Sequence, residues 1–283
     1  RSESTKEKAK SRIYKNLQTF VEEELLEAGK LEETYARINF AATVEEAVAG
    51  TDFIMETIVE NKDAKRELFA EIDRVAGTDC IIASNTSGLN VFELVPENRL
   101  CQMVIAHWYA PAQIIPLVEI VKSEQAPQEL ADTTVKLFER CGKTPVIMKK
   151  FIRGYIANRI QMCINQEVFF LLDNGYCTPE DIDKAVKTSF IPRAVVLGIC
   201  KRMDFGGLDM TANNFRNKSY TMPPAVDMPK TLAEHIEKNE LGIKTGKGFY
   251  DYEGVNKEEL LAKRDKQLFE VFKLVKKFMD DPV

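Results

Sequence analysis

The chain contains only two histidines, and one of them, His107, directly follows a short apolar run that ends at Ala106. An imidazole can take a proton from an alcohol near neutral pH if a partner fixes its tautomer and stabilises its cation. Glu119 lies in the next apolar run, beyond a loop bounded by Pro111 and Pro116 that could fold it back beside His107. This spacing predicts a histidine–carboxylate pair for general base catalysis. A strand-end histidine and a solvated surface acid would produce the same pattern, so spacing alone leaves both interpretations open.

Polar residues follow two further apolar runs at the point where each run ends. Glu60 comes directly after the run 53–59, and the small polar segment 84–87 follows the run 80–83. In an open parallel sheet, ligands bind outside the carboxyl ends of the strands. If these runs are strands, their polar residues converge with His107 at one edge, which is typical of a small-molecule site. Ser, Asn and Thr are also common in turns for local backbone reasons, so the segment 84–87 is a weak signal by itself.

The elements that must position these residues alternate in character over the first half of the chain. Strand-like runs cover residues 38–42, 53–59, 80–83, 103–106, 118–121 and 146–148, and helical patterns cover 3–28, 44–48, 62–75 and 128–141. Strands that alternate with helices predict an α/β fold with a mostly parallel, doubly wound sheet.

The character of the sequence changes near residue 150. A helical pattern runs without interruption from 155 to 174, and Thr178 followed by Pro179 provides an N-cap and a first-turn proline for the next helix. We therefore predict two domains, an α/β domain over residues 1–149 and an all-helical domain over residues 150–283. A single α/β domain with a helical tail is the alternative. Apolar residues on more than one face of the long helix also predict a homodimer through the helical domain.

Composition limits the classes of function. A chain of 283 residues with 45% hydrophobic and 29% charged residues is typical of a globular protein that can form two domains. The net charge of −5 offers no electrostatic basis for binding nucleic acid or an anionic membrane, and no apolar run is long enough to span a bilayer. Six scattered cysteines without a C-x-x-C pair argue against a metal site. They favour a reducing compartment, the cytoplasm by default, or the mitochondrial matrix if a transit peptide was removed.

Several segments carry distinctive polar and glycine-containing motifs. They are Ala-Ser-Asn-Thr-Ser (83–87), His-Trp-Tyr-Ala-Pro (107–111), Leu-Val-Glu (117–119), Gly-Tyr-Ile-Ala-Asn-Arg (154–159), Lys-Thr-Gly-Lys-Gly-Phe-Tyr (244–250), and Glu60-Asn61 with Lys65 downstream. In this order they resemble the signatures of the (S)-3-hydroxyacyl-CoA dehydrogenase family, and the resemblance covers nearly the whole chain. It implies a Rossmann-like NAD-binding domain and a helical domain that closes over the substrate and forms a dimer contact.

The resemblance also implies catalytic roles. His107 would be the general base toward the substrate 3-hydroxyl group, with Glu119 as its orienting partner. Ser87 and Asn158 would bind the reacting oxygen and help to place the substrate. The implied reaction is the NAD-dependent oxidation of a 3-hydroxyacyl-CoA to the 3-oxoacyl-CoA, a step of fatty acid metabolism.

The implied cofactor contacts come from both domains. Glu60, Lys65 and Ser87 would lie beside the nicotinamide half of NAD, and Lys244 would reach the cofactor from the second domain. A dinucleotide fold also needs a Gly-x-Gly-x-x-Gly turn after its first strand, and this sequence contains none. We therefore expect the first βαβ portion, about 30 residues, to be absent upstream of Arg1, so that the chain as it stands binds NAD poorly.

Two departures from the family pattern concern substrate recognition. Ala110 stands where the family has asparagine, three residues after the catalytic histidine. The helical pattern 3–28 is acidic in its second half, where the family has lysine contacts to CoA. These departures keep open a second enzyme interpretation, in which the substrate is a free 3-hydroxy acid such as carnitine or a sugar acid. A non-catalytic scaffold protein is a third interpretation, and the retained polar residues argue against it.

Overall fold

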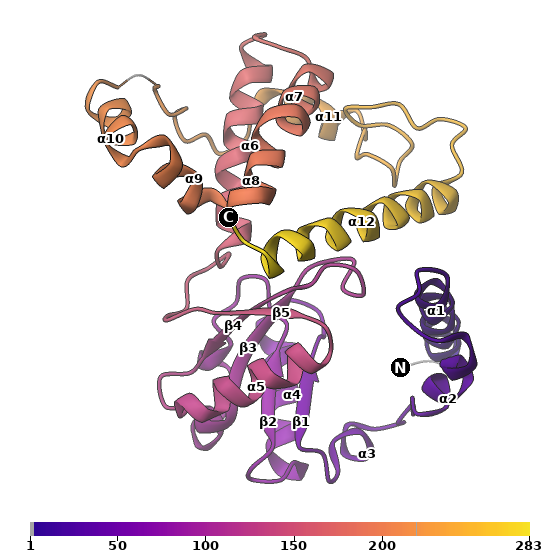
Figure 1. Cartoon of the computed structure of the whole chain (residues 1–283). Helices are drawn as coiled ribbons and strands as arrows, with labels where there is room; N and C mark the ends of the chain where they lie inside the picture. Colours follow the sequence, from indigo (N-terminus) through magenta and orange to yellow (C-terminus); the bar gives the residue numbers. More distant parts are fainter. Residues whose placement is uncertain (1–2, 219) are drawn as a thin grey trace. The chain divides into compact units, whose positions relative to one another are not determined.

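The structure is a computed structural model that describes residues 3–218 and 220–283. The chain forms two compact units, of which the first ends at Ile156 and the second begins at Ala157. The sequence analysis placed the domain boundary between residues 149 and 150. In Figure 1 the first unit extends from the indigo N-terminus to the magenta segments, and the second unit continues to the yellow C-terminus.

The first unit is built around one five-stranded sheet. Its strands are β1 (Phe53–Glu56), β2 (Ile81–Ser84), β3 (Met103–Trp108), β4 (Leu117–Lys122) and β5 (Thr144–Ile147), and they lie side by side in this order. All neighbouring pairs are parallel except β3 and β4, which are antiparallel. The prediction of a mostly parallel sheet is therefore confirmed, and the carboxyl ends of β1, β2 and β3 lie at the same edge.

Helices cover both faces of this sheet. The first unit contains α1 (Glu3–Glu22), α2 (Leu31–Ala36), α3 (Val44–Val48), α4 (Lys62–Val75) and α5 (Gln128–Arg140). Phe69 of α4 packs into one apolar core with Ile82, whereas Phe138 of α5 packs into a second core with Ala83. Because successive strand residues point to opposite faces, these neighbours in β2 place α4 and α5 on opposite sides of the sheet. This is the Rossmann-like, doubly wound arrangement that the sequence predicts.

Two predicted elements differ from the structure. The helix predicted over 3–28 ends at Glu22, because Glu24 has a φ of 61° and the amides of Leu25 and Leu26 bond to the Phe20 carbonyl. A left-handed residue of this kind closes a helix. The segment predicted as a strand over 38–42 has no regular secondary structure. Among the described residues no strand lies beside the outer edge of β1, so this segment does not extend the sheet.

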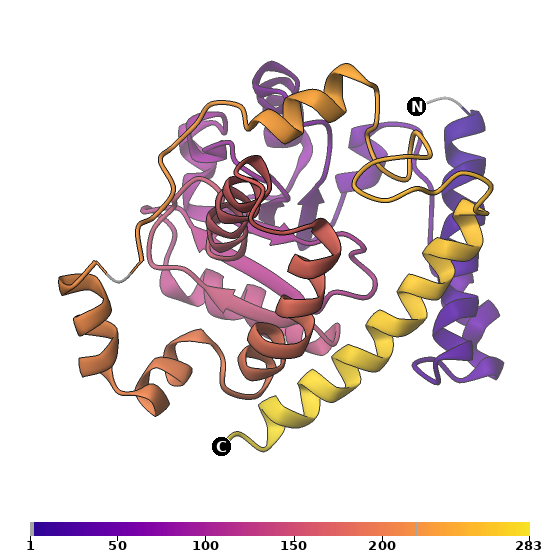
Figure 2. The ribbon, with the colours of Figure 1, turned by 90° about the horizontal axis from the view of Figure 1, so that it is seen from above.

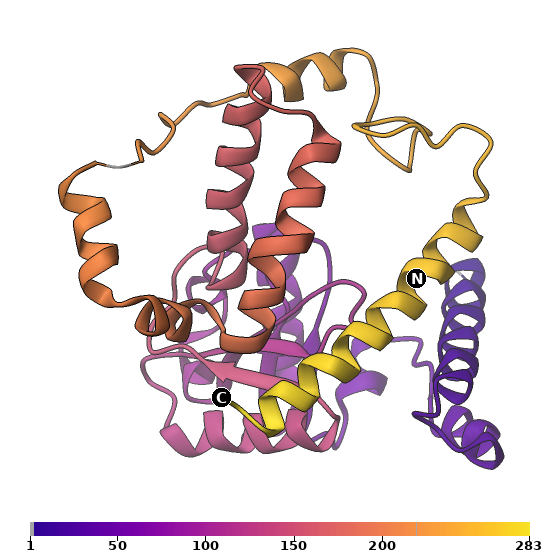
Figure 3. The same cartoon turned by 45° about the horizontal axis from the view of Figure 1, so that its top comes forward.

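The second unit is helical in its described part, as predicted. It contains α6 (Ala157–Asp173), α7 (Pro179–Ala185), α8 (Ile191–Leu197), α9 (Ile199–Gly206), α10 (Leu208–Arg216), α11 (Lys230–Glu237) and α12 (Lys257–Asp280). The predicted N-cap is present, since Thr178 and Asp181 form a reciprocal capping box at the start of α7. Helix α11 packs on α6, and the long helix α12 packs on α8 (Figure 3). Helices α9 and α10 form an arm that projects beyond α8 (Figure 2).

None of the described helices combines the length and the apolar character that crossing a membrane requires.

Candidate active site

A buried histidine–carboxylate pair lies between β3 and β4. The antiparallel register places His107 directly opposite Glu119. Residues opposite each other in such a pair point to the same face, with Cβ atoms about 4.5–5.5 Å apart. The His107 Nδ1 atom lies 3.1 Å from Glu119 Oε2, and the two residues are only 2% and 1% exposed. The contact predicted from their spacing is therefore present.

Hydrogen-bond donors surround the Glu119 carboxylate. The Tyr109 hydroxyl donates to Oε2 at 2.6 Å, and the Ile156 backbone amide donates to Oε1 at 2.9 Å. A buried charge is tolerated only when such partners replace water. In the tautomer that donates from Nδ1 to Glu119, the other ring nitrogen of His107 carries a lone pair and can accept a proton. The geometry is therefore that of an oriented general base.

The ring of Tyr155 packs on the face of the His107 imidazole ring. Its ring is stacked on His107 with centroids 4.5 Å apart, and its hydroxyl donates to the Thr86 carbonyl at 2.7 Å. Burial, followed by the negative charge of Glu60, raises the pKa of Tyr155 far above its usual value, so the phenol stays neutral. The sequence analysis did not single out this tyrosine, although it lies in the motif 154–159. The position of Tyr155 in that motif is the sequence signal from which it could have been identified.

The end of β1 is tied to the end of β2 through Glu60. Glu60 Oε1 accepts hydrogen bonds from the Thr86 hydroxyl at 2.6 Å and from the amides of Ser87, Gly88 and Leu89 at 3.0, 3.1 and 3.3 Å. Partial burial works to raise the pKa of Glu60, but these hydrogen bonds and the nearby Lys65 outweigh it and lower the pKa below its usual value. The structure thus brings the predicted site residues Glu60 and Ser87 together at the carboxyl edge, with Ser87 exposed.

The lowered pKa of Glu60 makes the first unit sensitive to acid. A carboxylate with a lower pKa in the folded than in the unfolded chain stabilises the fold above about pH 4.3, and this contribution is lost as the pH falls through the folded pKa. We therefore expect the unfolding midpoint of Glu60→Gln to fall less steeply than that of the unchanged protein between about pH 6 and 3. Fluorescence of Trp108, the only tryptophan, reports the midpoint. The exposed Glu129→Gln is the charge-matched control, and equal slopes for Glu60→Gln and the unchanged protein would contradict the expectation.

Lys65 lies behind Glu60 without any exposed surface. Its ammonium group donates to both oxygens of Glu56, at 2.7 and 2.8 Å, and lies 3.6 Å from Glu60 Oε2. Glu56 also accepts hydrogen bonds from the Ser84 hydroxyl and from the Ile58 amide. The family resemblance predicts that Lys65 contacts the cofactor, and in the structure its ammonium group lies beside two carboxylates. Glu56 was missed, although an acidic residue inside an apolar strand-like run is a signal that it is paired in the core.

The remaining predicted residues belong to the second unit. Asn158 lies half-buried in the first turn of α6. Lys244 is exposed in a tight turn that Gly242 and Lys247 close by an isolated bridge, and its carbonyl accepts a hydrogen bond from Lys257. His107, Glu119, Glu60 and Ser87 therefore belong to the first unit, whereas Asn158 and Lys244 belong to the second.

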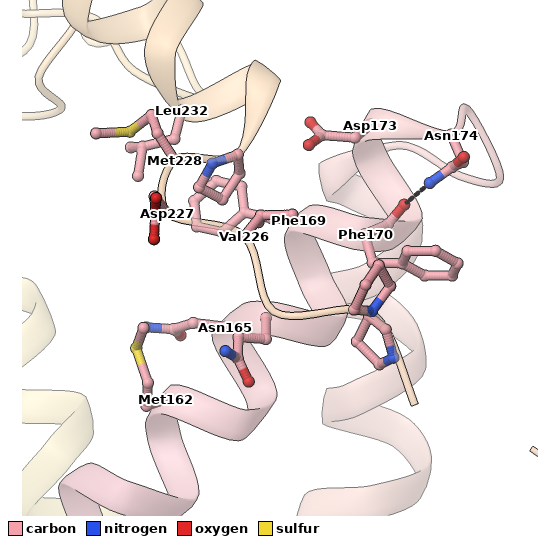
Figure 4. Close-up of a pocket in the computed structure, with 14 residues that line it drawn as sticks. Met162, Asn165, Phe169, Phe170, Asp173, Asn174, Val226, Asp227, Met228 and Leu232 are labelled. Carbon is pink, nitrogen blue, oxygen red and sulfur yellow. Dashed lines mark hydrogen bonds between the residues drawn. The ribbon is translucent and has the colours of Figure 1, made fainter. Parts of the chain in front are cut away.

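An apolar pocket of about 430 Å³ lies in the second unit between α6 and the segment 223–232 (Figure 4). Phe169 lines it from α6, and Val226 and Met228 line it from the opposite segment. Asp173 at its rim is engaged by the backbone amides of Lys230 and Thr231. The residues that line this pocket include no histidine, so the pocket lacks an imidazole base such as His107.

The described residues contain no group of three His, Cys, Asp or Glu side chains arranged to hold a metal ion.

Comparison with known proteins identifies the family. Residues 1–151 match the NAD-binding domain of 3-hydroxyacyl-CoA dehydrogenase, and residues 154–252 match the C-terminal domain of the same enzyme family. The chain belongs to the 3-hydroxyacyl-CoA dehydrogenase family. The predictions of this family, of NAD as cofactor and of a dehydrogenase that acts on a hydroxyl group are thus confirmed, and the scaffold interpretation is dropped.

Individual relatives of this family member differ in their substrates. A Bacillus subtilis protein named probable 3-hydroxybutyryl-CoA dehydrogenase is 32% identical, over 80% of this chain and 80% of its own length. The L-carnitine dehydrogenase of Oceanobacillus iheyensis is 29% identical, over 85% of this chain and 78% of its own. A crystal structure of 5-formyl-3-hydroxy-2-methylpyridine 4-carboxylic acid 5-dehydrogenase, an NAD-dependent dismutase, has a TM-score of 0.76 at 28% identity, covering 84% of this chain and 77% of that one.

Proposed function

We propose that this dehydrogenase oxidises the 3-hydroxyl group of a 3-hydroxyacyl-CoA to the 3-oxoacyl-CoA, with NAD as the hydride acceptor. The observation that carries the proposal is the buried contact of 3.1 Å between His107 and Glu119. Such a pair supplies a base that is oriented and whose cation is stabilised, as removal of an alcohol proton requires. Similarity to a 3-hydroxybutyryl-CoA dehydrogenase supports the substrate class.

The proposed chemistry transfers one proton and one hydride. NAD, when bound, would supply the acceptor for the hydride that leaves C3. As the C3–H bond breaks, the O–H proton passes to the ring nitrogen of His107 that faces away from Glu119. The C3–O single bond becomes a carbonyl, so the substrate loses two electrons and two hydrogens in total. Glu119 stabilises the imidazolium that forms. Tyr155 stacks on the imidazole ring and fixes its orientation.

The other predicted residues receive binding roles in this proposal. Ser87 and Asn158 bind the reacting oxygen, and Ser87 also contacts the cofactor. Glu60 lies beside the nicotinamide half of NAD, because it is a partly exposed carboxylate at the carboxyl edge where dinucleotides bind. Lys65 acts through Glu60 rather than by direct contact, since its ammonium group is buried against carboxylates. Lys244 contacts the cofactor from the second unit.

The proposal is tested by steady-state kinetics with the full-length protein. Reduction of acetoacetyl-CoA with NADH, and oxidation of carnitine with NAD, are followed by the absorbance of NADH. The 3-hydroxyacyl-CoA assignment requires a kcat/KM for the CoA substrate well above that for carnitine. Turnover of carnitine alone would overturn it in favour of a free 3-hydroxy acid.

A free 3-hydroxy acid is the second candidate substrate, and two observations favour it. The similarity to L-carnitine dehydrogenase is nearly as extensive as that to the CoA-dependent relative. The second half of α1 and the turn after it carry Glu22, Glu23, Glu24 and Glu27. Negative charge there would oppose the phosphates of CoA.

Ala110 tests how the loop after β3 recognises its ligand. The residue is exposed, so an asparagine fits without displacing the core, and its amide can hydrogen-bond a polar group of the cofactor or substrate. We expect Ala110→Asn to lower KM for NAD or for acyl-CoA about 2–10-fold, because one hydrogen bond contributes about 0.5–1.5 kcal/mol. The kcat stays within a few-fold, since neither the proton nor the hydride passes through this position. Initial-rate kinetics check both constants, and loss of activity would point to a loop shaped for a different substrate.

We further propose that the protein is a homodimer that associates through its helical unit. Large apolar side chains of the arm are solvent-exposed: Phe205 is 62% exposed, Leu208 60% and Phe215 81%. Exposed apolar surface on this scale is typical of an interface. Light scattering at micromolar concentration is expected to report twice the mass of the chain, and Phe215→Ser should reduce it toward the monomer. A monomer for the unchanged protein would contradict this proposal.

All six cysteines are free thiols, which supports a role in a reducing compartment such as the cytoplasm. We also propose that the reaction is a step of fatty acid metabolism, because the proposed substrate is an acyl-CoA. The proposal predicts that turnover does not change when a reductant such as dithiothreitol is added, because no disulfide is needed for the fold.

A further inference from the structure

We propose that Tyr109 is a positioning residue that sets the pH at which His107 becomes a base. Its hydroxyl shares one oxygen of Glu119 with His107 and so weakens the electrostatic attraction between that carboxylate and the imidazolium. The inference rests on the proposed function, in which His107 takes the substrate proton.

The geometry brings Tyr109 and His107 to the same oxygen atom of Glu119. Glu119 Oε2 lies 2.6 Å from the Tyr109 hydroxyl and 3.1 Å from His107 Nδ1, whereas the Ile156 amide binds the other oxygen. Tyr109 also packs edge-on against the imidazole, with ring centroids 4.6 Å apart. Tyr109 follows His107 by two residues, and residues two apart along an extended chain point to the same side. The sequence spacing therefore explains why the phenol and the imidazole meet the same carboxylate.

The shared oxygen has an electrostatic consequence. Glu119 stabilises the imidazolium in proportion to the negative charge that faces Nδ1, and a second donor on the same oxygen draws part of that charge away. Removal of the Tyr109 hydroxyl would leave more of this charge to act on His107. The imidazole would then keep its proton to a higher pH, and a smaller fraction of the enzyme would carry the base at neutral pH.

Two other ionisable groups of the site have hydrogen-bond partners other than Glu119. Tyr155 stacks on the face of the imidazole and donates its own proton to the Thr86 carbonyl. Glu60 is engaged by the Thr86 hydroxyl and by the following amides. Tyr109 instead donates its hydroxyl proton to Glu119 directly.

The two histidines of the chain make a direct test possible. The imidazole signals in proton NMR are few enough to assign with the single variant His235→Gln, and they report titration without turnover. In Tyr109→Phe, which removes only the hydroxyl, the midpoint of the His107 signal is expected to move up by about 0.5–1 pH unit, the size of one hydrogen bond. The His235 signal comes from the second unit and serves as the internal reference, because the substitution lies in the first unit.

A matched control removes a hydroxyl–carboxylate bond elsewhere. Tyr14 donates to Glu32 at 2.5 Å, and Tyr14→Phe should move neither histidine midpoint. Incorporation of 3-fluorotyrosine at position 109 provides a second variant, because a more acidic phenol is a stronger donor and should move the His107 midpoint down. No movement, or an upward shift with fluorotyrosine, would overturn the inference.

The rate profile separates this inference from the proposed function. In Tyr109→Phe the acid limb of the kcat/KM profile is expected to move up by the same amount as the NMR midpoint, while the rate on the plateau stays within a few-fold. A shift of the NMR midpoint without a shift of the acid limb would contradict the base role of His107 in the proposed function. It would leave the effect of Tyr109 on the imidazole in place.

Discussion

Replacing His107 with glutamine is expected to lower kcat about 10²–10⁴-fold, the usual contribution of a positioned base. Glutamine can still hydrogen-bond Glu119 and occupies a similar volume, so the buried carboxylate keeps a donor and the fold is preserved. Its amide cannot take a proton, and the alcohol therefore loses its acceptor. The affinity for NAD should stay near that of the unchanged protein, because the base acts on the substrate hydroxyl rather than on the cofactor.

The second histidine of the chain provides a matched control. His235 also has its Nδ1 atom beside a carboxylate, 2.8 Å from Glu240 Oε2, but it lies in the second unit on α11. The variant His235→Gln is expected to retain nearly full kcat. Absorbance of NADH measures turnover, and quenching of Trp108 fluorescence by NADH measures binding. A near-normal rate for His107→Gln would remove this residue from the mechanism.

Replacing Lys65 with methionine is expected to destabilise the first unit by about 3–5 kcal/mol, because it leaves a buried carboxylate without its cation. The side chains of Lys65 and Glu56 are both fully buried, so the carboxylate is held away from solvent. Urea unfolding followed by Trp108 fluorescence reports the change, since Trp108 lies in β3 of the first unit.

The double variant Glu56→Met, Lys65→Met is the control for this prediction. Replacing both charges with apolar groups of similar size removes the unpaired carboxylate, so most of the lost stability should return. A loss below about 1 kcal/mol for Lys65→Met alone would show that the pair is not desolvated as the geometry indicates.

Much of the fold follows from local sequence patterns. Asn61, directly before α4, accepts a hydrogen bond from the Ala64 amide and caps that helix, and Thr178 with Asp181 caps α7. These helix starts were readable because capping depends on residues that lie within one turn of each other. The five strands that form were also readable, since each is a short apolar run between turn residues. The run 38–42 has the same local pattern but forms no strand, so an apolar run alone does not predict strand pairing.

The sequence by itself determined which residues could do chemistry, whereas the tertiary structure decided which of them meet. The order of motifs led to the family and to His107 and Glu119, because the types of these residues and their place at apolar runs are local properties. That Glu119 faces His107 depends on the antiparallel register of β3 and β4, a property of two strands and not of one. Two contacts could not be placed from spacing: Tyr155 stacks on His107 from beyond β5, and the ammonium group of Lys65 is buried beside Glu56. Packing and desolvation select such contacts among residues far apart in the chain, and no local pattern records that selection.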